Sequence, residues 1–405
     1  MTPRLLRPRN PWRGLRGLPP HVWVVSAATL VNRVGTMVLP FLALYVTQHL
    51  GMPPSRAGLV LSAFGVGGLV AAPLGGWLSD RFGAVRVMAA GFVGSGLLLA
   101  LFPLVARYEV LVGLTTLWAV FSETARPATL VALTDGLRPD QRKAAIALNR
   151  LAVNLGMGIG PAVGGLLVST SFALLFWIDA VTAVAAGGLL ALAAGRLGIR
   201  PPDGRGPRPH GARDLLGALR DPRMGGLLVG TLLAFLVFEQ HRSTLPLFLT
   251  DGLGLSATFY GTLFLVNVGL ILLLEVPLNL ATAHWPHGRT LALGAALVAV
   301  GFGATGLAGG AAGVVATVVV WTFGEMLLFP GMAAYVADVA PEARRGAYMG
   351  AYSLTIWVAV IPASFLGTLL LERAGGGALW AASLVVGCAA AAAFALLVRR
   401  PTGRG

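Results

Sequence analysis

Long apolar runs alternate with short polar segments along the whole chain, and many of these runs reach twenty residues or more. Runs of this length are typical of helices that cross a lipid bilayer. Because lipid offers the backbone no hydrogen-bond partner, each crossing segment is expected to be helical. The pattern predicts an all-α polytopic membrane protein with twelve transmembrane helices, at residues 21–48, 56–79, 85–107, 110–135, 143–169, 172–195, 224–249, 257–281, 288–308, 311–338, 345–371 and 377–398.

The composition agrees with this pattern and narrows the chemistry. Of the 405 residues, 56% are hydrophobic and only 11% are charged. The single cysteine, Cys388, excludes a disulfide framework and a thiolate metal site. The sequence shows no nucleophile–base constellation, phosphate loop or metal-ligand cluster. We therefore expect no metal site, no cofactor and no enzymatic activity.

The net charge of +14 is explained by where the basic residues fall. If the N-terminus is cytoplasmic, most arginines lie in the cytoplasmic segments and few lie in the external loops. This asymmetry is typical of membrane proteins, whose cytoplasmic loops are enriched in Lys and Arg. We expect a multi-pass protein of the bacterial cytoplasmic membrane with both termini inside, and the charge does not require a nucleic-acid partner.

One long polar segment divides the chain into two groups of six predicted helices. Residues 196–223 are rich in Pro, Gly and Arg and are expected to form a cytoplasmic linker, with a short surface helix from Ala212 to Leu219. The predicted organisation is a cytoplasmic tail (1–20), a first bundle (21–195), this linker, a second bundle (224–398) and a cytoplasmic tail (399–405).

The two groups of helices resemble each other when one is shifted by about 202 residues. "WAVFSETARP" at 118–127 matches "WTFGEMLLFP" at 321–330, and Asp135 and Asp338 follow the two prolines at the same distance. Tandem repeats of this kind place a substrate site near the middle of the membrane, between halves that rock against each other. The repeat favours a transporter over a channel.

The segment "GGWLSDRFGAVR", between the second and third predicted helices, carries a recognisable loop pattern. It resembles the loop signature of the major facilitator superfamily, in which the loop latches the two halves on the cytoplasmic side. The matching residues are Gly76, Asp80, Arg81, Gly83 and Arg86, although Ala84 and Val85 stand where basic residues are usual. By position, we expect the gate to include also Asp135, Arg142, Asp338 and Arg344. The resemblance covers essentially the whole chain and implies the twelve-helix facilitator fold.

The fifth predicted helix contains "NLGMGIGPAVGG", which resembles the signature of the drug:proton antiporter (multidrug efflux) group. The residues of this motif are Asn154, Gly156, Gly160, Pro161, Gly164 and Gly165. At 100° per residue, Gly156, Gly160 and Gly164 share one face, which is expected to let a neighbouring helix approach closely. Arg150, Asn154, Gly158, Pro161 and Gly165 share the opposite face, which we interpret as polar. The fourth-helix pattern of those antiporters is absent, because Arg126 is followed by "PATL".

Several charged residues fall inside predicted helices, where each costs about 2.5–3.5 kcal/mol if it lies at the centre of the membrane. The basic ones are Arg33, Arg126, Arg150 and Arg242. The proton-coupling candidates are Glu239, Glu123, Glu325 and Glu275, with Glu239 as the first choice. Spacing predicts i,i+3 pairs of Glu123 with Arg126 and of Glu239 with Arg242. Arg33 is expected to find an acidic partner on another helix, and Asp179 is interpreted as architectural.

Aromatic and amide side chains in the central helices are candidates for lining a substrate site, although helix packing explains most of them equally well. They are Trp118, Phe121, Phe235, Phe238, Gln240, Trp321, Phe329 and Trp357.

Two functions remain open at this point. The first is proton-coupled efflux of small amphipathic or lipophilic compounds by a monomer, with protons, substrate and the lipid bilayer as partners. The second is an importer, or a dedicated exporter of one metabolite such as a sugar, an amino acid or a natural product.

Overall fold

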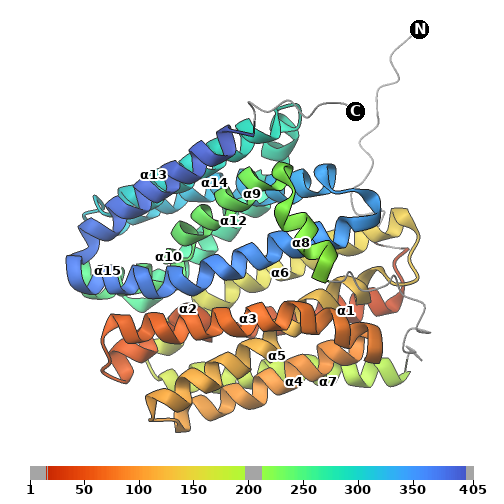
Figure 1. Ribbon diagram of the computed structural model, residues 1–405. Coiled ribbons are helices and arrows are strands. Elements are labelled where there is room, and N and C mark those ends of the chain that lie inside the picture. Colours follow the sequence, from red (N-terminus) through yellow and green to blue (C-terminus); the bar gives the residue numbers. More distant parts are fainter. Residues whose placement is uncertain (1–14, 16, 197–211, 398–405) are drawn as a thin grey trace.

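The computed structural model describes residues 15, 17–196 and 212–397, and these residues form helices and no strand. The helices lie in two halves, with the first (red to yellow-green) below the second (green to blue) in Figure 1. The tails and residues 197–211 of the predicted linker lie outside the described residues.

The first half contains nine helical elements. They are α1 (Pro20–Gly35), α2 (Val38–Leu44), the π-helical η2 (Tyr45–His49), α3 (Pro54–Phe82), α4 (Ala84–Leu101), the short η3 (Phe102–Leu104), α5 (Tyr108–Thr134), α6 (Pro139–Val168) and α7 (Phe172–Arg196).

The second half follows the linker helix α8 (Ala212–Arg220), which the sequence predicted to within one residue. Its elements are α9 (Pro222–Phe238), α10 (Gln240–Ser243), α11 (Leu245–Leu247), the π-helical η4 (Phe248–Gly252), α12 (Ala257–Thr282), α13 (His287–Thr305), α14 (Ala311–Val339), the short η5 (Glu342–Arg344) and α15 (Arg345–Ala395).

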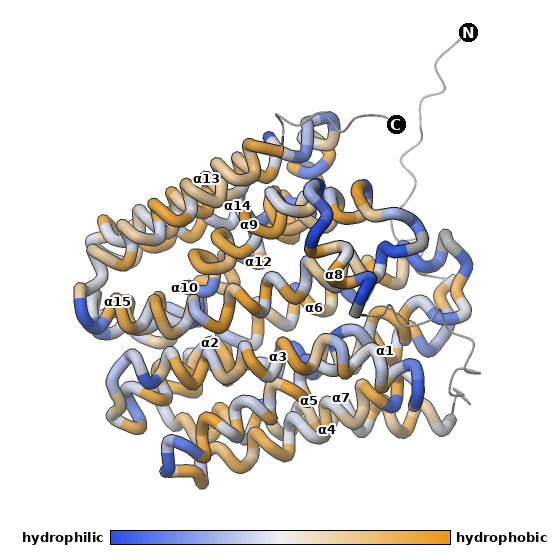
Figure 2. The backbone as a smooth tube through the Cα atoms, in the orientation of Figure 1, coloured by the Kyte–Doolittle hydropathy of each residue, from blue (hydrophilic) through white to orange (hydrophobic). Residues whose placement is uncertain are grey.

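Ten helices of the described chain are long and apolar enough to cross a membrane. In Figure 2 hydrophobic residues follow one another along these helices, and hydrophilic residues are concentrated at helix ends and along α8. One of the ten, α15, has 51 residues and is divided at Gly375, whose φ of 77° favours glycine. The predicted span at 110–135 corresponds to α5, which is not among the ten. The total of twelve spans therefore stays a prediction, although helices occupy all twelve predicted positions.

The tandem repeat is visible in the irregular parts of the helices. The π-helical segments η2 and η4 lie 203 positions apart, each near the end of the first helix of its half. Prolines inside helices also recur 201 to 204 positions apart, as Pro73 and Pro277, Pro127 and Pro330, and Pro161 and Pro362. Each half thus repeats the same backbone distortions as well as the same helix order.

The first membrane helix is broken between Gly35 and Val38. The carboxylate of Asp179, on α7, accepts hydrogen bonds from the amides of Met37 and Val38 at 3.1 and 3.2 Å. These amides begin α2 and have no partner within their own helix. A carboxylate is favoured at such a helix start. The architectural interpretation of Asp179 agrees with this geometry.

The two halves meet along two pairs of helices, α3 against α15 and α6 against α12. In the first pair, the Ser62 hydroxyl donates to the Ile361 carbonyl. In the second pair, the Thr258 hydroxyl donates to the Gly165 carbonyl at 3.0 Å. Both contacts rely on small side chains, which allow helix backbones to approach closely in lipid.

The end of the bundle that carries the loop motif is called the motif end, and the other end is called the opposite end. Further contacts between the halves lie at the opposite end. The Gln48 amide donates to Thr250 and Asp251, so η2 contacts η4 directly. The Ser55 amide donates to Glu372 of α15 at 2.8 Å. The opposite end is therefore closed by contacts between the halves.

Asp221 joins the linker to the second half. Its carboxylate caps α9 through the Arg223 amide at 2.9 Å and accepts a hydrogen bond from the Tyr348 hydroxyl at 2.6 Å. Partial burial opposes any lowering of its pKa, but the hydrogen bonds from Tyr348 and Arg223 outweigh burial and lower the pKa of Asp221 below its usual value. The ionised side chain thus stabilises this junction.

Asp221→Ala is expected to lower the free energy of unfolding at pH 7 by about 1 kcal/mol, the usual contribution of a helix N-cap. Because the folded-state pKa is lowered, this contribution is present above the unfolded value of about 3.9 and is lost as pH falls through the folded value. Thermal unfolding of the purified protein at pH 7 and pH 3 should show the difference shrinking. Asp221→Asn keeps a capping acceptor and should lose less at pH 7; an equal difference at both pH values would contradict this role.

Candidate functional site

The charged residues inside the membrane helices fall into three arrangements. Two glutamates pair with an arginine three residues further along the same helix. One pair joins the two halves. Three groups, Arg33, Glu325 and Asp179, form no ion pair with the described residues, and Asp179 caps α2 instead.

The two local pairs agree with the sequence prediction. Glu123 contacts Arg126 at 3.2 Å on α5, and Glu239 contacts Arg242 at 3.0 Å where the first helix of the second half is broken. Glu123 and Glu239 are both buried. Each carboxylate therefore has its counter-charge one turn away on its own helix.

The pair between the halves joins Arg150 on α6 to the carboxylate of Glu275 on α12. The Glu275 side chain is only 11% exposed, whereas the Arg150 side chain is 56% exposed. An arginine so exposed in the middle of a membrane helix is costly unless water reaches it. The Arg150 guanidinium is therefore exposed at the contact between α6 and α12, where it holds the carboxylate of Glu275 from the other half.

Glu325 on α14 lies beside this pair. Its carboxylate accepts a hydrogen bond from the Asn267 amide at 2.8 Å, and it lies within electrostatic range of Glu275. Asn267, on α12, also donates to the Thr322 hydroxyl, which fixes the amide in place. Arg150, Glu275 and Glu325 thus form a network across the halves, in which Arg150 pairs with Glu275 and Glu325 lies within electrostatic range of Glu275.

Arg33 lies within electrostatic range of acids on two other helices, Glu123 of α5 and Asp179 of α7. It lies in the last turn of α1, and its guanidinium makes no hydrogen bond or ion pair with the described residues. Its Nε atom is buried and unsatisfied, and so is Oε2 of Glu123. The expected acidic neighbours are therefore present on other helices, without a direct ion pair.

The glycine motif of α6 presents two faces, as the sequence predicts. A Cβ atom at Gly160 would lie 2.8 Å from the Val34 carbonyl oxygen, and Gly156 faces the same segment of α1. On the other face, Gly158 lies against Val268, and Gly165 lies against Ala257. The second face is therefore a packing surface between the halves, and its polar groups are confined to the motif-end part of the helix, where Arg150 and Asn154 lie.

The loop motif does not latch the halves in this conformation. Gly83, with a φ of 88°, forms the turn between α3 and α4. Asp80 is exposed, and Arg81 lies over the rings of Trp77 and Phe82 on its own helix. Neither residue bonds to a described residue of the second half. Within the described part of the chain, the motif end thus lacks the contacts expected of a closed gate.

The other gate candidates contact their own halves or the linker. Arg142 donates to the Leu137 carbonyl. Asp338 bonds to His287 at 2.8 Å, and Arg344 contacts Asp214 of α8 at 3.6 Å. The exposed Asp135 has no hydrogen bond from its side chain to the described residues, and a Cβ atom at Gly76 would meet open space.

Most of the aromatic candidates pack inside one half. In the second half, the ring of Phe238 lies 4.8 Å from that of Phe329 and 5.9 Å from that of Trp321, and Phe235 stacks on Phe329. In the first half, Trp118 donates to the Ser95 hydroxyl. These rings are accounted for by helix packing.

Gln240 and Trp357 each contact a helix other than their own. The Gln240 amide donates to the carbonyls of Leu236 and Ala363, and its oxygen accepts from Ser243 and Thr244. Its hydrogen-bonding capacity is therefore used in joining α10 to α15. Trp357, on α15, packs against Gly68 of α3 and so lies at the contact between the halves.

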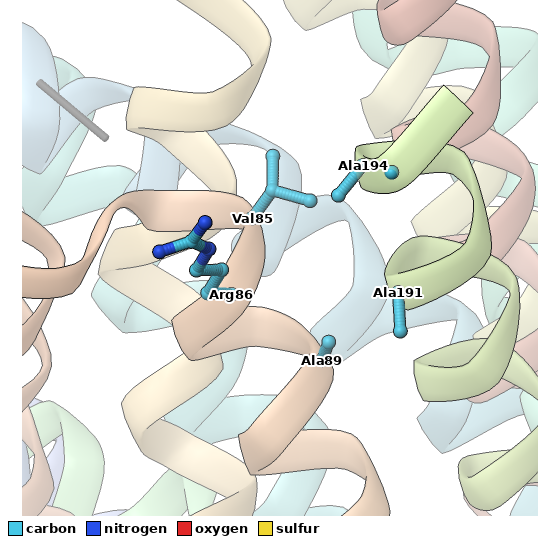
Figure 3. Close-up of a pocket in the computed structure, with 6 residues that line it drawn as sticks. Val85, Arg86, Ala89, Ala191 and Ala194 are labelled. Atoms are coloured by element: carbon cyan, nitrogen blue, oxygen red, sulfur yellow. The ribbon is translucent and has the colours of Figure 1, made fainter. Parts of the chain in front are cut away.

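Phe121 lies away from the space between the halves. It lines an apolar hollow between α3, α4 and α5, together with Leu74, Gly91 and Thr124. A second hollow, of about 410 Å³, lies between α4 and α7, where Val85, Ala89, Ala191 and Ala194 face one another (Figure 3). Both hollows belong to the first half alone, so neither forms a path between the halves.

Sequence reasoning missed Asn267, which holds Glu325. An asparagine inside the apolar run "LFLVNVGLIL" was the available signal, because amides in membrane helices commonly bond across to a neighbouring helix. The partner itself, 58 residues away, has no signature in the sequence.

Comparison with known proteins agrees with this geometry. An uncharacterized MFS-type transporter of Bacillus subtilis, YqjV, is 26% identical over 365 residues, or 89% of each chain. The Na(+), Li(+), K(+)/H(+) antiporter of Planococcus maritimus is 25% identical over 349 residues, covering 78% of this chain and 81% of that protein.

A crystal structure of a POT family transporter in complex with a thioalcohol-conjugated peptide matches the fold with a TM-score of 0.78 at 16% identity, covering 96% of this chain and 97% of the other. The sequence profile of the Major Facilitator Superfamily matches residues 25–274 and 227–405. The chain therefore belongs to the major facilitator superfamily and is a multi-pass membrane transporter rather than an enzyme.

Proposed function

We propose that this transporter exports small amphipathic or lipophilic compounds in exchange for protons, by exposing a site between its halves alternately to the two sides of the membrane. The observation that carries the proposal is the network of Arg150, Glu275 and Glu325. In it, a guanidinium of the first half pairs with Glu275 of the second half, and Glu325 lies within electrostatic range of Glu275.

The network links protonation to the arrangement of the halves. One guanidinium can neutralise one of the two carboxylates, and the other must take up a proton or remain hydrated. Because Arg150 and Glu275 belong to different halves, separating these helices would leave Glu275, like Glu325, without a counter-charge. A proton on one acid therefore favours one arrangement, and its loss favours the other.

We assign the transported proton to Glu325 ahead of Glu239, Glu123 and Glu275. Glu239 and Glu123 each hold an arginine one turn away, and Glu275 holds Arg150. The carboxylate of Glu325 has a neutral amide as its hydrogen-bond partner. Gaining or losing a proton at Glu325 breaks no ion pair, so the change requires the least rearrangement.

Export is supported by the orientation expected from the basic residues. With the motif end in the cytoplasm of a bacterium, the described state is closed to the outside and unlatched inside, which is the state in which an exporter takes up its substrate. The α6 glycine motif supports the same direction, because it resembles that of drug:proton antiporters. The name of the Planococcus maritimus relative indicates that exchange with protons occurs on this scaffold.

The test is dye accumulation in bacterial cells that lack their own efflux pumps. Cells producing the protein should retain less of at least one amphipathic dye, such as ethidium or Hoechst 33342, than cells with an empty vector. Nigericin, which collapses the pH gradient, should abolish this difference, because the proton supplies the driving force. Glu325→Gln should also abolish it, whereas Glu109→Gln, at an exposed acid of α5, should leave it unchanged.

Three outcomes would overturn the proposal. Higher accumulation in the producing cells would indicate import. Efflux that persists after nigericin would exclude proton coupling, and unchanged efflux in Glu325→Gln would move the proton to another group. Equal accumulation of every dye in producing and control cells would contradict a broad amphipathic specificity and favour a dedicated exporter.

A further inference from the structure

The apolar hollow between α3, α4 and α5 takes no part in the proton network or in the contact between the halves. Its volume of about 360 Å³ lies within the range of about 300–1,000 Å³ that is typical of small-molecule pockets. Apolar side chains form most of its wall, among them Leu74, Leu78, Val87 and Phe121. Of the described residues that line it, Arg86 alone is charged. The hollow thus combines an apolar wall with one cation.

The position of the hollow places its charge at the membrane surface and its apolar wall in the hydrocarbon. Phe82, Arg86 and Ala90 at its rim are exposed on the first half. Phe82 ends α3, and Arg86 lies in the first turn of α4, so both lie at the motif end. Leu74 lies about 12 Å further along α3, at 1.5 Å per residue. One leaflet supplies about half of the 30 Å hydrocarbon core, so the hollow extends through most of a leaflet.

The guanidinium groups at the rim are available to an anion from the membrane. Arg86 is exposed and makes no ion pair with the described residues, and Figure 3 shows its guanidinium pointing away from α7. Arg81 lies over the ring of Phe82, 5.5 Å from its centre, which places a second guanidinium at the same rim. Asp80 is exposed nearby but does not line the hollow. Arginine binds phosphate oxygens well, because its donors form a planar fork.

We propose that this hollow binds an anionic phospholipid of the leaflet at the motif end, with its phosphate at Arg86 and one acyl chain between α3, α4 and α5. The guanidinium favours a phosphate over a neutral headgroup, and the apolar wall favours a lipid over a free anion. The bilayer around the first half supplies the ligand directly. This inference does not depend on the direction of transport or on the coupling ion.

The experiment compares three ligands that separate the phosphate from the chains. Dioleoylphosphatidylglycerol carries both, dioleoylglycerol carries the same chains without the phosphate, and sn-glycerol 3-phosphate carries the phosphate without the chains. Native mass spectrometry of the purified full-length protein measures the dissociation constant of the first molecule bound. Dioleoylphosphatidylglycerol should bind roughly tenfold or more tightly than either of the others, as expected for a charge-assisted hydrogen bond added to an apolar contact.

Two variants, each with a matched control, then locate the site. Arg86→Gln should weaken binding of dioleoylphosphatidylglycerol to the level of dioleoylglycerol, whereas Arg345→Gln, at another exposed arginine of the motif end, should bind as the wild type does. Ala90→Phe places a ring in the hollow and should weaken binding of both lipids. Leu97→Phe, at an exposed position of α4 outside the hollow, is its control. Size-exclusion chromatography checks that each variant is folded.

Three results would overturn the lipid site. Equal affinity for dioleoylglycerol would show that the phosphate is not recognised, and equal affinity for sn-glycerol 3-phosphate would show that the hollow does not hold a chain. Wild-type lipid binding by either Arg86→Gln or Ala90→Phe would show that the guanidinium and the hollow do not act as one site. Because binding is measured without a gradient, none of these results bears on proton coupling.

Discussion

Replacing Gly160 with leucine should abolish transport while the protein still inserts into the membrane. A Cβ atom at this position would lie 2.8 Å from the Val34 carbonyl oxygen and 3.0 Å from the Arg33 carbonyl oxygen. Both obstacles are backbone atoms, so no change of side-chain rotamer relieves the overlap. Overpacking of this kind typically costs about 1–3 kcal/mol and moves the neighbouring helix. Here that helix is α1, which carries Arg33.

The measurement is dye efflux normalised to the amount of protein in purified membranes. Gly113→Leu is the matched control, because a Cβ atom there meets nothing within 4 Å and the residue is exposed on α5. Gly160→Ala should give intermediate transport, since the smaller side chain requires a smaller displacement. Wild-type efflux by Gly160→Leu would show that close packing of α1 against α6 is not required.

Reversing the charge of Glu275 should reduce transport by about tenfold or more, the factor that corresponds to 1.4 kcal/mol. Glu275→Arg places two guanidinium groups where α6 and α12 now hold an ion pair. Like charges at a contact between packed surfaces cost several kcal/mol and exclude that arrangement. The described conformation should therefore become less populated. Efflux and the amount of protein in the membrane are both measured.

The double variant with Arg150→Glu and Glu275→Arg restores opposite charges and should recover part of the lost transport. A double-mutant cycle then isolates the interaction of the pair from the separate effects of each substitution. Arg373→Glu, which reverses an exposed charge at the opposite end, serves as the control for net charge. If the double variant transports no better than the worse single variant, the ion pair is not what limits transport.

The positions of the membrane helices were predictable because each is a local property of the sequence. Apolar length set them, and the described helices begin and end within a few residues of the predicted spans. The interruptions were not predictable. The break after Gly35 depends on Asp179, which lies 142 residues from the Met37 amide that it binds. No local sequence pattern indicates that a side chain of another helix will cap the start of α2.

The ion pairs of the site show the same difference between local contacts, which were predictable, and distant contacts, which were not. The Glu123–Arg126 and Glu239–Arg242 pairs followed from a spacing of three residues on one helix. The Arg150–Glu275 pair joins residues 125 positions apart, so it depends on how the halves pack. Arg33 is the instructive case. Its position in an apolar run predicted an acidic partner on another helix, and the fold brings Glu123 and Asp179 within electrostatic range without forming an ion pair among the described residues.

The π-helical turns that touch at the opposite end are a feature that the two halves share. A π turn closes with one residue more than an α turn, and both halves hold this surplus at equivalent places, in η2 and η4. The repetition of one six-helix unit predicts this coincidence, because each copy then ends its first helix with the same turn. Deleting one residue from η2 alone would make the two copies unequal, turning the helix end by about 100° and carrying Gln48 away from Thr250 and Asp251.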